Sequence, residues 1–182
     1  DPQPVEPVLD SLTRWSAHAP DDTLIVFLGD NAYPEGVTQA RQADAELRLQ
    51  RQLDAVGDAT AWFVPGNHDW ANGDEEGLEA IRRQEAFLEP RAMFVPDRGC
   101  PGPHTTDLPR NTDPVVRVVA LDTQWWLHEH EKQTTDCTHA TPDAITAGLT
   151  DALDTPLPVV VVAHHPLATH GPHGGFFTWR DH

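Results

Sequence analysis

Three short segments of the sequence combine side chains that can hold a metal ion, and each directly follows an apolar run. GDNAY begins at Gly29, GNHD begins at Gly66, and HHP begins at His164. Their carboxylate, amide and imidazole groups together suit borderline divalent or trivalent ions better than a zinc site built from thiolates. The glycines of the first two segments allow the chain to turn sharply, so that the next side chain can face a shared cleft. The segments therefore predict a metal site assembled from separate parts of the chain.

The apolar runs are typical of buried strands, and amphipathic segments lie between them. The predicted strands cover residues 23–28, 60–64, 115–121 and 158–163, and the predicted helices cover residues 5–18, 38–56, 78–88 and 141–153. This alternation predicts an α/β fold with at least partly parallel sheets. Such folds bind ligands at the carboxyl ends of their strands, which is where the three segments stand.

The remaining segments are predicted to be loops. Residues 96–114 and 169–177 contain many turn-forming residues, and residues 128–139 are polar. Residues 128–130, with the sequence HEH, imitate the spacing of a two-histidine metal ligand, but we interpret them as an exposed loop. Trp125 and Trp126 follow the third strand, and we expect them to pack in the core and at its rim rather than to form an aromatic wall beside a substrate.

The composition indicates one acidic globular domain over residues 1–182. The chain is 38% hydrophobic, which suffices for a core and excludes an intrinsically disordered protein. Its net charge of −17 at pH 7 leaves no basic surface for nucleic acid. The acidity suits either an ordinary solvated surface or a halophile-type surface in which acidic residues replace lysine. No apolar run approaches the roughly 18 residues of a membrane span.

Taken together, GDNAY, GNHD and HHP resemble three successive motifs of the calcineurin-like metallophosphoesterases. The purple-acid-phosphatase branch is the most similar, because Tyr33 stands at the tyrosine of its GDxxY motif. The resemblance extends from about residue 23 to the C-terminus. It implies a four-layer αββα sandwich with two mixed β-sheets and two metal ions at one edge, with iron beside zinc, manganese or a second iron.

Carried over position by position, the resemblance implies four metal ligands. Asp30 corresponds to the carboxylate that bridges the two ions. Asn67 and His164 correspond to ligands of the second ion. Tyr33 corresponds to a phenolate ligand of the first ion, which the resemblance implies is iron.

The same resemblance implies two catalytic residues. His68 corresponds to a general acid, or a group that stabilises the transition state at the leaving oxygen, and Asp69 is expected to orient its ring. His165 is a candidate substrate contact, as are His170 and His173 in the following loop, where a plain turn is the alternative.

The implied activity is acid-phosphatase-like hydrolysis of phosphate monoesters, by direct attack of a metal-bound hydroxide on a small phosphorylated substrate. Two alternatives stay open. A phosphodiesterase or nucleotide hydrolase would use the same site. A non-catalytic metal-binding module would retain the fold alone.

The family pattern also includes an upstream Gly-Asp motif and a downstream GHxH motif, and neither is found in this sequence. We therefore expect a partial domain, truncated at both ends, that is inactive by itself. Cys100 and Cys137 suit either two free thiols or a disulfide. Because the branch it resembles is often exported, the resemblance favours the disulfide and an extracytoplasmic location.

Overall fold

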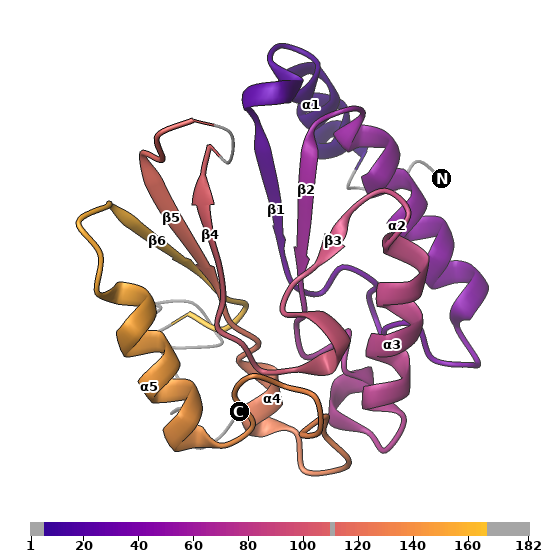
Figure 1. Ribbon diagram of the computed structural model, residues 1–182. Coiled ribbons are helices and arrows are strands. Elements are labelled where there is room, and N and C mark those ends of the chain that lie inside the picture. The colour runs from indigo at the N-terminus through magenta and orange to yellow at the C-terminus, as the bar shows by residue number, and fades with distance from the viewer. Residues whose placement is uncertain (1–5, 110–111, 167–182) are drawn as a thin grey trace.

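The computed structural model describes residues 6–109 and 112–166. In these residues, two three-stranded sheets pack against each other, with helices on their outer sides (Figure 1). Sheet A contains the parallel strands β1 (Leu24–Leu28), β2 (Thr60–Val64) and β3 (Met93–Phe94). Sheet B contains β4 (His104–Leu108), β5 (Val116–Ala120) and β6 (Val159–Val162). In sheet B, β4 is antiparallel and β6 is parallel to β5. The predicted α/β fold with two sheets is confirmed.

The helices are α1 (Glu6–Ser16), α2 (Gln42–Val56), α3 (Gly77–Leu88), the short α4 (Gln124–Leu127) and α5 (Pro142–Leu153), and single 3₁₀ turns cover Pro20–Asp22, Ala71–Gly73 and Asp97–Gly99. In Figure 1, α2 and α3 cover the side of sheet A that faces away from sheet B, and α5 lies beside sheet B. Across the described ranges, we find no helix that is both long enough and apolar enough to cross a membrane.

Alternate side chains of sheet A enter two different cores. Phe63 of β2 joins the core beneath the helices, where it meets Leu49 of α2 and Ile81 of α3. Its neighbours point to the other side, because successive strand residues face opposite faces of a sheet. The core between the two sheets contains Trp62, Val64, Val95, Val118 and Ala120. The two sheets are therefore held together by apolar packing below the edge that carries the predicted metal site.

The structure adds two strands that the sequence did not predict. The two-residue β3 precedes the predicted loop at 96–114, and β4 lies within that loop. The sequence of β4, HTTDL, is mostly polar, as suits a strand at the edge of a sheet: among the described residues, it pairs with β5 alone. Its Asp107 is paired with Arg117 across the strands, with 2.6 Å between Oδ1 and Nε. Polar edge strands lack the apolar signal of a buried strand.

Two helix starts can be compared with their predictions. The helix expected from residue 38 begins at Gln42. The helix expected from residue 141 begins as predicted, because the Thr141 hydroxyl accepts a hydrogen bond from the Ala144 amide and Pro142 occupies the first turn.

Cys100 and Cys137 form a disulfide, with 5.6 Å between their Cα atoms. This confirms the disulfide alternative. The bond joins the loop after β3 to the segment at 128–139, which contains no helix or strand, as predicted.

Candidate metal centre

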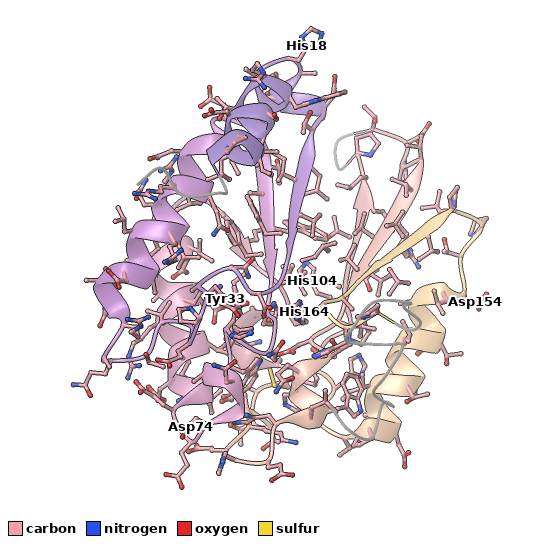
Figure 2. All side chains as sticks on the ribbon, turned by 180° about the vertical axis from the view of Figure 1, so that it is seen from behind. His18, Tyr33, Asp74, His104, Asp154 and His164 are labelled. Carbon is pink, nitrogen blue, oxygen red and sulfur yellow. A yellow bond between two sulfur atoms is a disulfide. The ribbon has the colours of Figure 1, made fainter. Side chains whose placement is uncertain are left out.

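The three predicted motifs meet where β1, β2 and β6 end. Nε2 of His164 lies 3.1 Å from Oδ1 of Asn67 and 3.4 Å from Oδ1 of Asp30. Figure 2 shows His164 and Tyr33 near this end of the strands. Metal bonds of about 2.0–2.2 Å leave neighbouring ligand atoms of one ion roughly 3 Å apart. The distances from Nε2 of His164 to these two oxygens are therefore those expected between ligands of one ion.

The imidazole of His164 is oriented by the last residue of β1. Its Nδ1 lies 2.8 Å from the carbonyl oxygen of Leu28. A carbonyl can only accept, so Nδ1 carries the proton and donates it in this hydrogen bond. The lone pair of Nε2 is then directed toward Asp30 and Asn67, which is the arrangement that metal-binding histidines adopt.

Two glycines allow the loops to approach so closely. A Cβ atom on Gly29 would overlap Nδ1 of His164, and a Cβ atom on Gly66 would overlap the carboxylate and the backbone nitrogen of Asp30. Gly29 also has a φ of 98°, in the left-handed region that side chains disfavour. The sequence suggested sharp turns as the reason for these glycines, and at Gly66 the reason is close packing.

Asp69 is completely buried and joins the loops that follow β1 and β2. Its carboxylate accepts hydrogen bonds from the backbone amides of Asn31, Ala32 and Gly66, and from the Asn31 side chain, over 2.8–3.2 Å. Burial raises the pKa of Asp69, and the three backbone hydrogen bonds oppose that shift. The expectation that Asp69 orients the ring of His68 is therefore wrong: the carboxylate points back into the two loops.

The ring of His68 is held from other directions. Nδ1 lies 2.5 Å from the carbonyl oxygen of Pro34, and Nε2 lies 3.9 Å from Oδ2 of Asp30. The His68 backbone amide donates to Oδ1 of Asp30 over 3.1 Å. The ring of Tyr33 covers the imidazole, with 4.1 Å between ring centroids, and is itself 54% exposed. His68 therefore presents Nε2 beside Asp30 in a partly open position, which suits a group that exchanges protons.

The loop after β5 supports the HHP segment. The hydroxyl of Thr123 lies 2.8 Å from Nδ1 of His165 and accepts a hydrogen bond from the His165 amide over 3.2 Å. The rings of His164 and His165 lie 4.9 Å apart. The structure thus gives His165 a contact with Thr123, while its predicted contact with substrate stays a prediction. His170 and His173 lie outside the described residues.

Asp122, at the end of β5, is a second completely buried carboxylate that sequence reasoning did not single out. It accepts hydrogen bonds from the indole of Trp70 over 2.8 Å and from the Trp125 amide over 3.1 Å. Burial raises the pKa of Asp122 to about 7, and the negative charge of Asp69 adds to the increase. A signal was present in the sequence, because this aspartate directly follows a predicted strand.

The HEH segment is only partly the exposed loop that was predicted. Glu129 and His130 are exposed, but His128 is 1% exposed and packs against Trp70, with 4.7 Å between ring centroids. The apolar indole favours burial of the imidazole, and burial lowers the pKa of His128. Trp125 is buried and Trp126 is exposed, in line with the predicted core and rim packing.

Within residues 6–109 and 112–166, no three His, Cys, Asp or Glu side chains gather as a metal-binding group. The site described here has a mixed composition, in which the imidazole of His164 lies beside one amide oxygen and one carboxylate. A family model described as calcineurin-like phosphoesterase matches residues 6–181 of the chain. Neither the curated proteins nor the solved structures include a match.

Proposed function

The chain belongs to the calcineurin-like phosphoesterase family, and we propose that it is an acid-phosphatase-like hydrolase that cleaves phosphate monoesters at a dinuclear metal centre. The family implies metal-dependent hydrolysis of phosphoesters of small molecules. The observation that carries the proposal is the contact between His164, Asn67 and Asp30 at the ends of three strands.

These residues fit the metal ions that the family uses. By the family resemblance, Asp30 would be a ligand of both ions, Asn67 and His164 would hold one of them, and Tyr33 would hold the other. Two bound ions supply a nucleophile from water at moderate pH and neutralise charge on the phosphoryl oxygens. The neutralisation matters here, because a chain with a net charge of −17 otherwise repels a phosphate.

His68 is the residue that we place at the leaving oxygen. Its Nδ1 is turned toward the Pro34 carbonyl, so the ring can present Nε2 on the side of Asp30. A protonated Nε2 donates to the oxygen of the departing alcohol as the ester bond breaks. Tyr33 limits the positions that this ring can take, because it covers one face.

The decisive experiment separates metal binding from catalysis. Because the chain by itself is expected to be inactive, the test uses the full-length protein. After chelation and reloading with iron and zinc or manganese, it should hydrolyse p-nitrophenyl phosphate faster than the corresponding diester. His68→Ala should lower kcat by about 100-fold with the metal content unchanged, whereas Asp30→Asn should lose metal first. Faster cleavage of the diester would support the phosphodiesterase alternative, and no hydrolysis of either ester would support the non-catalytic module.

We assign the chain to the purple-acid-phosphatase branch on the position of Tyr33, the only tyrosine of the sequence. A phenolate bound to Fe(III) absorbs visible light by charge transfer, so the iron-loaded protein should be coloured and Tyr33→Phe should bleach it. An iron-free or colourless protein with full activity would contradict this assignment.

The Cys100–Cys137 disulfide supports an extracytoplasmic location, because such bonds persist in oxidising compartments. Fractionation of the native host, with the protein detected in its reducing cytoplasm, would contradict this location.

A further inference from the structure

The carbonyl of Pro34 accepts two hydrogen bonds, and the second donor comes from outside the predicted motifs. The first donor is Nδ1 of His68, at 2.5 Å. The second donor is Nδ2 of Asn72, at 2.9 Å. A carbonyl oxygen carries two lone pairs, so it can satisfy both donors together. The Pro34 carbonyl, which orients the His68 ring, is therefore itself held by a residue of the 3₁₀ turn Ala71–Gly73.

The backbone of Asn72 is bonded to the loop that carries His68. Its amide donates to the carbonyl oxygen of Asn67 over 3.0 Å. The side chain of Asn72 then reaches across to Pro34, in the loop after β1. Asn72 is exposed, so it connects the two loops on the outside of the protein, whereas Asp69 connects them in the interior.

Asparagine suits this position because of the backbone conformation there. Asn72 has a φ of 54° and a ψ of 27°, in the left-handed region. Glycine, asparagine and aspartate enter this region more readily than most residues. Of these three, only asparagine has a side-chain N–H group that can donate to a carbonyl. Asparagine thus combines the left-handed backbone with the donor that contacts Pro34.

The turn that contains Pro34 is closed by a hydrogen bond from the Gly36 amide to the Ala32 carbonyl, over 2.8 Å. A Cβ atom on Gly36 would overlap the backbone oxygen of Asp69, so this end of the turn packs closely on the loop after β2. A peptide group inside a turn can rotate while the ends of the turn stay in place, as the difference between type I and type II turns shows. The hydrogen bond from Asn72 opposes this rotation at the Pro34 carbonyl.

We propose that Asn72 is a positioning residue for His68. By fixing the Pro34 carbonyl, Asn72 keeps the Nδ1 proton of His68 in its hydrogen bond and keeps Nε2 on the side of Asp30. The inference rests on the proposed function, in which the P–O bond to the alcohol breaks, its electron pair moves to the alcohol oxygen, and the Nε2 proton joins that oxygen. Asn72 acts through His68 rather than by contact with the substrate.

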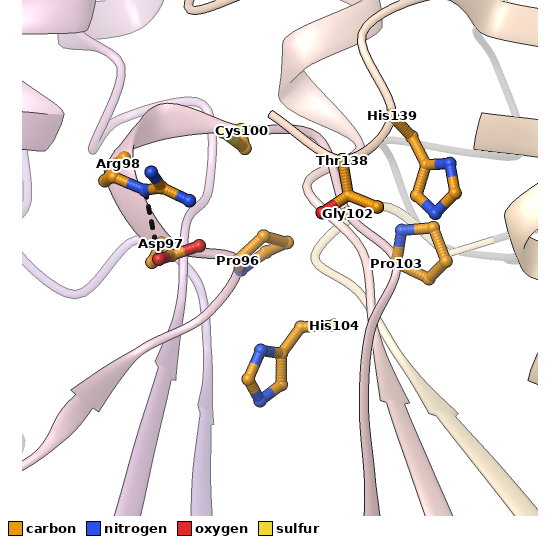
Figure 3. Close-up of a pocket in the computed structure, with 9 residues that line it drawn as sticks. All are labelled: Pro96, Asp97, Arg98, Cys100, Gly102, Pro103, His104, Thr138 and His139. Atoms are coloured by element: carbon orange, nitrogen blue, oxygen red, sulfur yellow. Dashed lines mark hydrogen bonds and ion pairs between the residues drawn. The ribbon is translucent and has the colours of Figure 1, made fainter. Parts of the chain in front are cut away.

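Arg98 provides a matched control. It is likewise the middle residue of a single 3₁₀ turn, Asp97–Gly99, with a φ of 58° and a ψ of 20°. Its side chain pairs with Asp97 at a separate pocket beside the disulfide, whose described lining residues all lie outside the metal centre (Figure 3). Glycine at either position keeps the left-handed backbone and removes only the side chain. Asn72→Gly and Arg98→Gly therefore differ in the contact that is tested.

The first measurement follows the His68 ring in the full-length protein after chelation. At alkaline pH, where the imidazole is neutral, its proton should be on Nδ1, as long-range proton–nitrogen NMR correlations would show. In Asn72→Gly we expect a mixture of the two neutral tautomers, because the acceptor for Nδ1 is no longer fixed. In Arg98→Gly we expect the original tautomer. The original tautomer in Asn72→Gly would overturn the proposal.

The second measurement is the kinetics of the metal-loaded full-length protein. With p-nitrophenyl phosphate, Asn72→Gly should lower kcat about tenfold and leave KM and metal content unchanged, because a proton donor acts in the transition state. Arg98→Gly should leave kcat unchanged. In a protein that already carries His68→Ala, Asn72→Gly should cause no further loss, since its effect passes through His68.

The outcomes separate this inference from the proposed function. Equal kcat values in Asn72→Gly and Arg98→Gly would overturn the role of Asn72 and leave the proposed function intact. An undiminished effect of Asn72→Gly in the His68→Ala protein would do the same. A normal kcat in His68→Ala would instead reject the proposed role of His68, while the tautomer measurement would still report whether Asn72 positions its ring.

Discussion

The loop after β2 and the loop after β5 each bury an aspartate completely, yet they surround it with different groups. Asp69 receives four N–H groups, all from the turn after β1 and from its own loop. Asp122 accepts one hydrogen bond from the indole of Trp70, in the segment after β2, and one from the backbone amide of Trp125 in α4. Asp69 therefore joins two neighbouring loops of sheet A, and Asp122 joins sheet B to sheet A.

This difference separates two tasks that a metal site between two sheets requires. Asp69 sets the positions of Asp30 and Asn67 relative to one another, because it bonds to residues adjacent to both. Asp122 sits behind Thr123, which holds His165 and through it the neighbouring His164. Asp122 is also the group whose pKa burial raises to about 7, so its charge changes in a pH range where enzymes work. Asp69 keeps the ligands in place, whereas Asp122 is the carboxylate whose pKa burial brings to about 7.

The largest effect should come from Asp69→Ala. The substitution leaves four N–H groups without an acceptor in a buried position, and each such loss costs about 1–3 kcal/mol. We expect the free energy of unfolding to fall by more than about 3 kcal/mol, measured in urea. Metal affinity, measured by titration of the chelated protein, should fall about 10- to 100-fold, as for other groups that support metal ligands.

Comparing the metal affinities of Asp122→Ala and Asp69→Ala tests whether the two carboxylates have different roles. Because Asp122 does not contact Asp30 or Asn67, metal affinity should change much less than in Asp69→Ala. Equal losses of metal affinity in the two variants would show that both carboxylates position the ligands. The exposed Asp54→Ala serves as a surface control and should leave metal affinity unchanged.

The next effect concerns pH. Asp122 has a pKa of about 7 in the fold against an ordinary value of 3.8, so the folded protein keeps a proton that the unfolded chain has released. Stability must then fall as pH rises from about 4 to about 7, by up to about 1.4 kcal/mol per pH unit. In Asp122→Asn this slope should become shallower, as urea unfolding of the chelated protein at several pH values would show.

Asp69 contributes a slope of the same sign, because burial raises its pKa too, so some dependence should remain in Asp122→Asn. Trp70→Phe gives a directional check. The indole hydrogen bond lowers the pKa of Asp122, so its removal should move the midpoint of the pH dependence upward. An unchanged slope in Asp122→Asn would mean that Asp122 does not change its charge in this range.

Much of this arrangement could be predicted from the sequence, because the ligands directly follow apolar strands. Parallel strands bring their carboxyl ends to one edge, so Asp30 and Asn67 were expected to lie near each other. The polar strand β4 could not be predicted, since it is stabilised by its pairing with β5 rather than by its own apolar residues.

Side-chain direction was the part of the site that sequence reasoning could not supply. Asp69 is adjacent to His68 in the chain, yet its carboxylate points into the turn after β1, where unpaired amides need an acceptor. The bond between Trp70 and Asp122 joins residues 52 positions apart, and no local pattern encodes such a contact. Burial of His128 has the same origin, because it depends on the position of Trp70.

The smallest effect should come from Thr123→Val, which tests the last link between Asp122 and the metal site. Valine keeps the shape of threonine and removes the hydroxyl that contacts His165 at its amide and its ring. We expect stability to fall by about 1 kcal/mol and metal affinity to fall by tenfold or less, because His164 keeps its own bond to Leu28. Thr123→Ser should restore both, since it returns the hydroxyl. If Thr123→Val lowered metal affinity as much as Asp69→Ala, the loop after β5 would position the ligands directly, and its difference from the loop after β2 would disappear.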